Sequence, residues 1–138
     1  MKLLISISIL FYCLLLSCSD NIFIPENHLF SLSDTLSLDF RETLANSDEN
    51  ISISFNSIIS DGRCPVDLRC FWEGNAEIRL IFRKGTQNVE FSLNTAGSYF
   101  PNDTLLFGYS IKLIDLLPYP ISNLEYKPHD YSVKLVIE

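Results

Sequence analysis

Cysteine is the residue type with the clearest capacity for chemistry in this chain of 138 residues, which contains four of them. Cys64 and Cys70 stand six positions apart with no histidine nearby. That spacing does not match the cysteine pairs of zinc sites, whereas an even pair of cysteines in an exported protein usually closes as a disulfide. We therefore expect a Cys64–Cys70 disulfide and no metal site.

The N-terminal segment predicts export. Lys2 supplies a positive charge, and residues 3–16 form an apolar run. A spanning helix needs about 20 apolar residues, so this run is short for a membrane span. Its length suits the apolar core of a secretory signal, which is about 7–15 residues.

The end of that run carries the second chemical candidate, because residues 15–18 read Leu-Leu-Ser-Cys. This stretch resembles the lipobox of bacterial lipoproteins, in which a small residue precedes the cysteine that accepts lipid. The resemblance implies cleavage before Cys18, a diacylglyceryl group on its thiol and a further acyl chain, such as palmitate, on its amino group. The alternatives are an ordinary signal peptide cut near Ser17 or Ser19 and an uncleaved anchor.

The lipobox sets the expected organisation of the chain. Residues 1–17 are the signal peptide, residues 18–33 are a tether that leads into the domain, and residues 34–138 are one domain. Ser19 follows the lipidated cysteine; by resemblance to the sorting of enterobacterial lipoproteins, it implies the outer membrane of a bacterial envelope. The membrane is then the first partner of the protein, through the lipid on Cys18.

The net charge argues against two classes of partner. The formal net charge is −7 at pH 7. An acidic balance argues against nucleic acid and against electrostatic attraction to anionic membranes. We expect a monomer that binds an envelope protein or a glycan.

Alternation of apolar and polar residues with a period of two predicts an all-β domain. The alternating segments are residues 36–40, 51–55, 75–93, 105–113 and 131–137, of which 75–93 reads as a hairpin turning at Gly85. About seven strands predict a small antiparallel β-sandwich of Ig-like general form, or a small barrel. Residues 114–117 could form one helical turn before Pro118.

One motif is distinctive, the segment 61–76 with the sequence DGRCPVDLRCFWEGNA. It resembles a group of small, uncharacterised bacterial lipoproteins that carry R-C-P-x4-C-x-W-x-G-x-A before a strand. These proteins also carry a late stretch that ends in P-Y-P, matched here by residues 118–120. The resemblance covers most of the chain beyond the signal and implies no activity.

The motif has a structural interpretation and a functional alternative. In the structural one, Pro65 fixes a tight loop that the disulfide closes, Trp72 is a large apolar anchor, and Gly74 permits a bend before the strand. In the alternative, the rigid loop presents Arg63 and Arg69 to a trypsin-like protease as an inhibitor would.

Catalytic residues are not identifiable. His28 and His129 are the two histidines, and neither lies in a hydrolase or metalloprotease motif. We therefore expect a membrane-anchored envelope lipoprotein that binds or supports a partner, and neither an enzyme nor a cofactor-binding protein.

Overall fold

The structure is a computed structural model that describes residues 29–138. The expected signal peptide (1–17), the lipidation residue Cys18 and His28 lie outside the described residues. No helix in the described part is long and apolar enough to cross a membrane.

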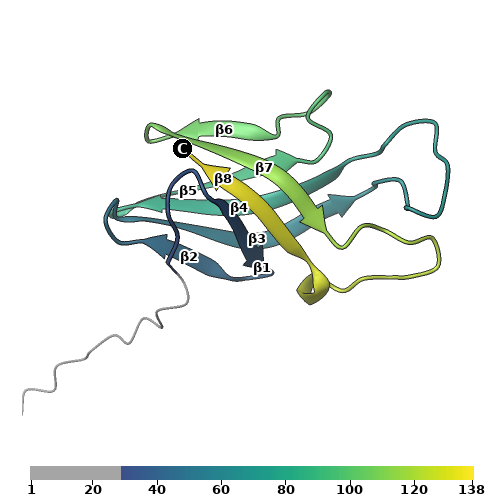
Figure 1. Cartoon of the computed structure of the whole chain (residues 1–138), viewed down its shortest axis with the longest axis horizontal. Coiled ribbons are helices and arrows are strands. Elements are labelled where there is room, and N and C mark those ends of the chain that lie inside the picture. The colour runs from purple at the N-terminus through teal and green to yellow at the C-terminus, as the bar shows by residue number, and fades with distance from the viewer. Residues whose placement is uncertain (1–28) are drawn as a thin grey trace, which may run out of the picture.

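Two antiparallel sheets of four strands each form a β-sandwich, which confirms the predicted fold class (Figure 1). The strands in chain order are β1 (Thr35–Asp39), β2 (Thr43–Asn46), β3 (Ile51–Asp61), β4 (Ala76–Lys84), β5 (Gln87–Asn94), β6 (Asp103–Leu106), β7 (Tyr109–Leu117) and β8 (Ser132–Ile137). One sheet has the order β2-β3-β4-β5 and the other β1-β8-β7-β6. Within residues 29–138 the strands form two separate sheets and not one closed sheet, so the barrel alternative is wrong.

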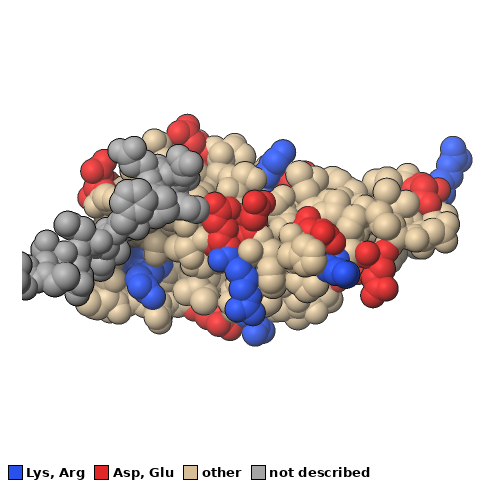
Figure 2. Space-filling view, turned by 90° about the horizontal axis from the view of Figure 1, so that it is seen from below, with Lys and Arg blue, Asp and Glu red and all other residues tan. Residues whose placement is uncertain are grey.

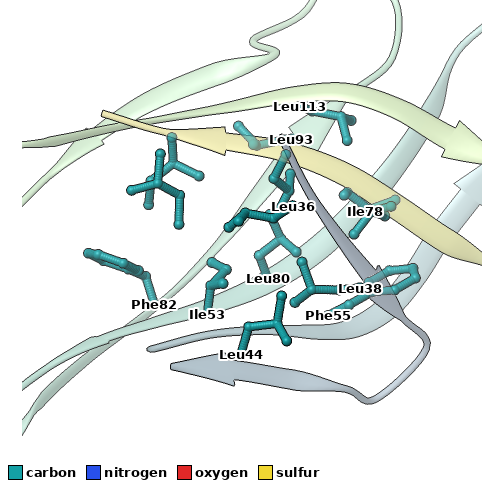
Figure 3. Close-up of a cluster of buried hydrophobic side chains, with 14 of the residues drawn as sticks. Leu36, Leu38, Leu44, Ile53, Phe55, Ile78, Leu80, Phe82, Leu93 and Leu113 are labelled. Carbon is teal, nitrogen blue, oxygen red and sulfur yellow. The ribbon is translucent and has the colours of Figure 1, made fainter. Parts of the chain in front are cut away.

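The core lies between the sheets because each strand turns its apolar side chains to the same side. In β4 the burial alternates, with Ile78, Leu80 and Phe82 fully buried. Figure 3 shows these side chains meeting Leu36 and Leu113 from the opposite sheet. Burial of each such side chain contributes about 1.5–3 kcal/mol to folding. Phe30, upstream of the first strand, also lies in this core.

Two predictions about strands are wrong. The stripe at 105–113 is not one strand but the hairpin of β6 and β7, which turns at Phe107 and Gly108 with positive φ at both residues. The apolar alternation of the sequence runs on through the turn, although the register pairs Leu106 with Tyr109 and so places Leu105 on the opposite, exposed face. Residues 114–117 continue β7 past a bulge between Leu113 and Asp115 instead of forming a helical turn.

The long strand β3 sets the two ends of the sandwich. The first described residues lie at its beginning, where Leu29 bridges to Ala45 and the amide of Phe30 donates to the Ala45 carbonyl at 3.2 Å. Its eleven residues extend about 33 Å, at 3.3 Å per residue. The distinctive motif begins at Asp61, the last residue of the strand. The described chain therefore starts at one end and the motif lies at the other.

Candidate functional site

The distinctive motif is the connection between β3 and β4, and its cysteines are joined. Cys64 and Cys70 form a disulfide with an S–S distance of 2.06 Å and a Cα–Cα distance of 6.0 Å. The predicted disulfide is therefore confirmed. It closes a small loop that projects beyond the ends of the sheets (Figure 1).

Arg63 is the buried centre of the motif, with 7 % of its surface exposed. Its Nε donates to Oδ1 of Asp61 at 2.9 Å, and its Nη2 donates to Oδ2 at 2.7 Å. A two-point pair of this kind is the strongest geometry for an arginine and a carboxylate. The inhibitor alternative requires Arg63 to be exposed to solvent, and in the structure it is buried.

The remaining contacts of the Arg63 side chain reach across to the end of β7 and to the loop that follows it. Its Nη1 donates to the carbonyl of Leu116, and its Nη2 also donates to the carbonyl of Pro118 at 2.8 Å. The guanidinium lies over the ring of Tyr119 at 5.1 Å. One buried cation thus joins the distinctive motif to the P-Y-P stretch, which is more than 50 residues away in the sequence.

Further hydrogen bonds join the β3–β4 loop to the β7–β8 loop, farther from the sheets. The amide of Val66 donates to the carbonyl of Pro120 at 2.9 Å. Asp67 accepts from the amide of Ser122 at 2.9 Å and from its hydroxyl. We call these joined loops, residues 62–75 and 118–127, the distal tip.

Gly74 is required by the backbone of the distal tip. Its φ is +75°, and a Cβ built on it would lie 2.1 Å from the Gly62 carbonyl oxygen. A side chain here would collide with the opposite strand of the loop, so the expected bend at Gly74 is confirmed. Pro65 occupies the turn inside the disulfide loop, where its carbonyl accepts from the Leu68 amide at 3.0 Å.

The surface of the distal tip is unusually apolar. Phe71 is fully exposed, and Trp72 is 53 % exposed. Trp72, the expected large apolar anchor of the motif, therefore has about half of its surface in contact with solvent, and the buried side chain of the motif is that of Arg63. The exposed large apolar residues of the distal tip are Val66, Leu68, Phe71, Trp72, Tyr119, Ile121 and Leu124. Arg69 is exposed among them.

The ionised form of Asp61, the partner of Arg63 beneath the apolar surface of the distal tip, is stabilised by its neighbours. Burial alone would raise the pKa of Asp61. The hydrogen bonds and the charge of Arg63, together with a hydrogen bond from Tyr131, outweigh burial and lower this pKa below its ordinary value of 3.8. The Tyr131 hydroxyl donates to Oδ2 of Asp61 at 3.1 Å. Burial and the neighbouring Asp61 raise the pKa of Tyr131. At neutral pH the pair is therefore ionised, with the carboxylate fully bonded.

The cavity at the distal tip is small. A cavity of about 150 Å³ lies beside Arg63, lined in part by Glu73, Asp115 and Tyr119. Pockets for small-molecule ligands are commonly 300–1,000 Å³. Within residues 29–138, no group of three or more histidine, cysteine or acidic side chains could hold a metal ion. His129 is exposed, on the short 3₁₀ turn Pro128–Asp130.

Comparison with known proteins adds no assignment: no family model, curated protein or solved structure matches this chain. The sequence pointed to the motif through its cysteines, proline and glycine. It gave no signal that Leu116, Pro118 and Ser122 complete the site, because two of these contacts use main-chain carbonyls.

Proposed function

We propose that this protein is a lipid-anchored lipoprotein of the bacterial envelope that works by binding and not by catalysis. In this proposal Cys18 carries the lipid, and the sandwich is a rigid spacer between the anchor and the distal tip. The distal tip is the binding surface.

The observation that carries the proposal is the exposed apolar surface of the distal tip. A monomeric soluble domain rarely exposes a contiguous apolar patch without a role in interaction. The disulfide and the hydrogen bonds between the loops hold this surface in one shape. A preorganised surface loses less conformational entropy on binding, which favours affinity.

The position of the distal tip supports the same proposal. The described chain starts at the opposite end of β3, about 33 Å away. A lipid on Cys18 would attach the protein through that opposite end. The anchor and the binding surface would then act without obstructing each other.

The anchor is tested by labelling cells with a palmitate analogue and isolating the protein. We expect label on the unaltered protein and none on Cys18→Ala, with an unlabelled product that accumulates uncleaved. Cys13→Ala is the matched control, because it removes the other N-terminal cysteine and should leave labelling unchanged. Label retained by Cys18→Ala would refute the lipidation site.

A second candidate function is protease inhibition through the disulfide loop. Burial of Arg63 leaves Arg69 as the exposed arginine next to a disulfide cysteine. Inhibition of a trypsin-class protease by micromolar protein, lost in Arg69→Ala, would support this function. Unchanged protease activity would eliminate it.

A further inference from the structure

The exposed apolar side chains of the distal tip have no groove to fill. The loops that carry them project past the ends of both sheets (Figure 1). The cavity at the base of the distal tip is small, and Val66, Leu68, Phe71 and Trp72 do not line it. These four side chains therefore do not enclose a small ligand in that cavity.

The apolar side chains are graded in exposure. Phe71, at 106 %, and Val66, at 64 %, are the most exposed and have no polar atoms. Trp72 and Tyr119, at 53 % and 46 %, are closer to the body of the protein and each carries one polar group. Tryptophan and tyrosine favour the boundary between hydrocarbon and water, and the purely apolar residues favour the hydrocarbon beyond it.

The charges of the distal tip are compatible with shallow insertion. On the face in Figure 2, charged side chains at the end opposite the grey segment are scattered and do not form a patch of one sign. The Asp67 carboxylate accepts two hydrogen bonds from Ser122, which lower its pKa and stabilise its ionised form at the water side of the distal tip. Arg69 has a long side chain whose charged end can stay in water while its stem lies in apolar surroundings.

Other occupants fit the distal tip less well. Leucine and valine are under-represented among the residues that dominate protein–protein binding, yet aliphatic residues make up four of the seven exposed apolar side chains.

We propose that the distal tip inserts into the boundary region of a lipid bilayer, the same bilayer that holds the acyl chains on Cys18. The inference rests on the proposed function for its anchor. The chain from Cys18 to Leu29 spans at most about 40 Å when extended. It therefore lets the sandwich lie along the membrane, with its N-terminal end and the distal tip both at the surface. Insertion to about 5–10 Å is the depth of interfacial binding elements.

Trp72 allows a direct test, because it is the single tryptophan of the chain. The acylated protein is reconstituted in zwitterionic vesicles with or without lipids brominated on their acyl chains. We expect Trp72 fluorescence to be quenched by the brominated lipids and shielded from acrylamide in the water. Phe71→Ser should lower the ratio of inserted to withdrawn distal tips about tenfold, because a fully exposed aromatic side chain no longer enters the bilayer.

Leu105→Ser is the matched control, since Leu105 is 72 % exposed on β6 and lies outside the distal tip. It should leave the Trp72 signal unchanged. If the protein floats with the vesicles but acrylamide still quenches Trp72, the distal tip does not insert. That result would overturn the inference and would not affect the lipid anchor on Cys18. Shielding that needs a high protein-to-lipid ratio, or added envelope protein, would also overturn it in favour of self-association or a protein partner.

Lipidation of Cys18 is tested separately, by flotation of the protein with the vesicles. Protein that fails to float with the vesicles counts against lipidation of Cys18. In that case quenching of Trp72 by brominated lipid in added vesicles still decides whether the distal tip inserts.

Discussion

The sandwich and the distal tip are built in opposite ways. In the sandwich, apolar side chains such as Phe55 are inside and polar ones are outside. In the distal tip, the charged Arg63 is inside and the apolar Phe71 is outside. The sandwich gains its stability from apolar burial, whereas the distal tip is held by an ion pair, main-chain hydrogen bonds and a disulfide. This arrangement leaves the apolar residues of the distal tip free to bind.

The largest expected effect comes from one chemical change made in both regions. Phe55→Ala should lower the free energy of unfolding by about 3–5 kcal/mol, because it opens a cavity in a fully buried position. Phe71→Ala should change it by less than about 0.5 kcal/mol, because the ring contacts solvent. Urea denaturation measures both. Similar losses in the two variants would contradict the difference between the regions.

Next in size is the removal of the buried cation. Arg63→Met should cost about 3 kcal/mol, because it leaves the carboxylate of Asp61 buried without its partner. Adding Asp61→Asn to the same chain should recover part of that loss, since no unpaired charge then stays inside. A double-mutant cycle by urea denaturation gives the coupling. Additive effects of the two substitutions would mean that the pair does not organise the distal tip.

The disulfide should matter less. Replacing Cys64 and Cys70 together by serine should cost about 2 kcal/mol, the estimate for a loop this short. Circular dichroism should still report the β-sandwich, because its core does not include the distal tip. Loss of the entire fold would show that the two regions are not separable in this way.

The smallest effect concerns a single hydrogen bond and its pH dependence. Because the pKa of Asp61 is lowered in the folded state, its contribution to stability is present above the unfolded value near 3.8 and is lost as pH falls through the folded pKa. Tyr131→Phe removes a hydrogen bond to this carboxylate and raises its folded-state pKa, so it should cost about 1 kcal/mol and make the loss complete at a higher pH. Thermal unfolding from pH 2 to 7 measures it. An unchanged acid limb would exclude Tyr131 from the pair.

The sequence predicted the sandwich because period-two alternation survives wherever one face of a strand is buried, as in β4 and β8. It concealed the turn at Phe107, because the apolar alternation continues through the turn even though Leu105 faces solvent, and it gave no sign of the short edge strand β2. In the distal tip, the cysteines and Gly74 were readable because their chemistry is local. The burial of Arg63 was not, because it depends on main-chain carbonyls of Leu116 and Pro118, which are distant in the sequence. Nothing in the local sequence indicated the exposure of Trp72 either.

The central claim is that the distal tip keeps its charge inside and its apolar residues outside, and the fluorescence of Trp72 tests it most directly. The chain starting at Ser19, which carries no acyl group, is measured in dilute solution without lipid or detergent. The account predicts emission typical of a water-exposed indole, open to acrylamide, with little further red shift on unfolding in urea. Blue-shifted, shielded emission that moves to the red on unfolding would show that Trp72 is a buried anchor and would contradict the account.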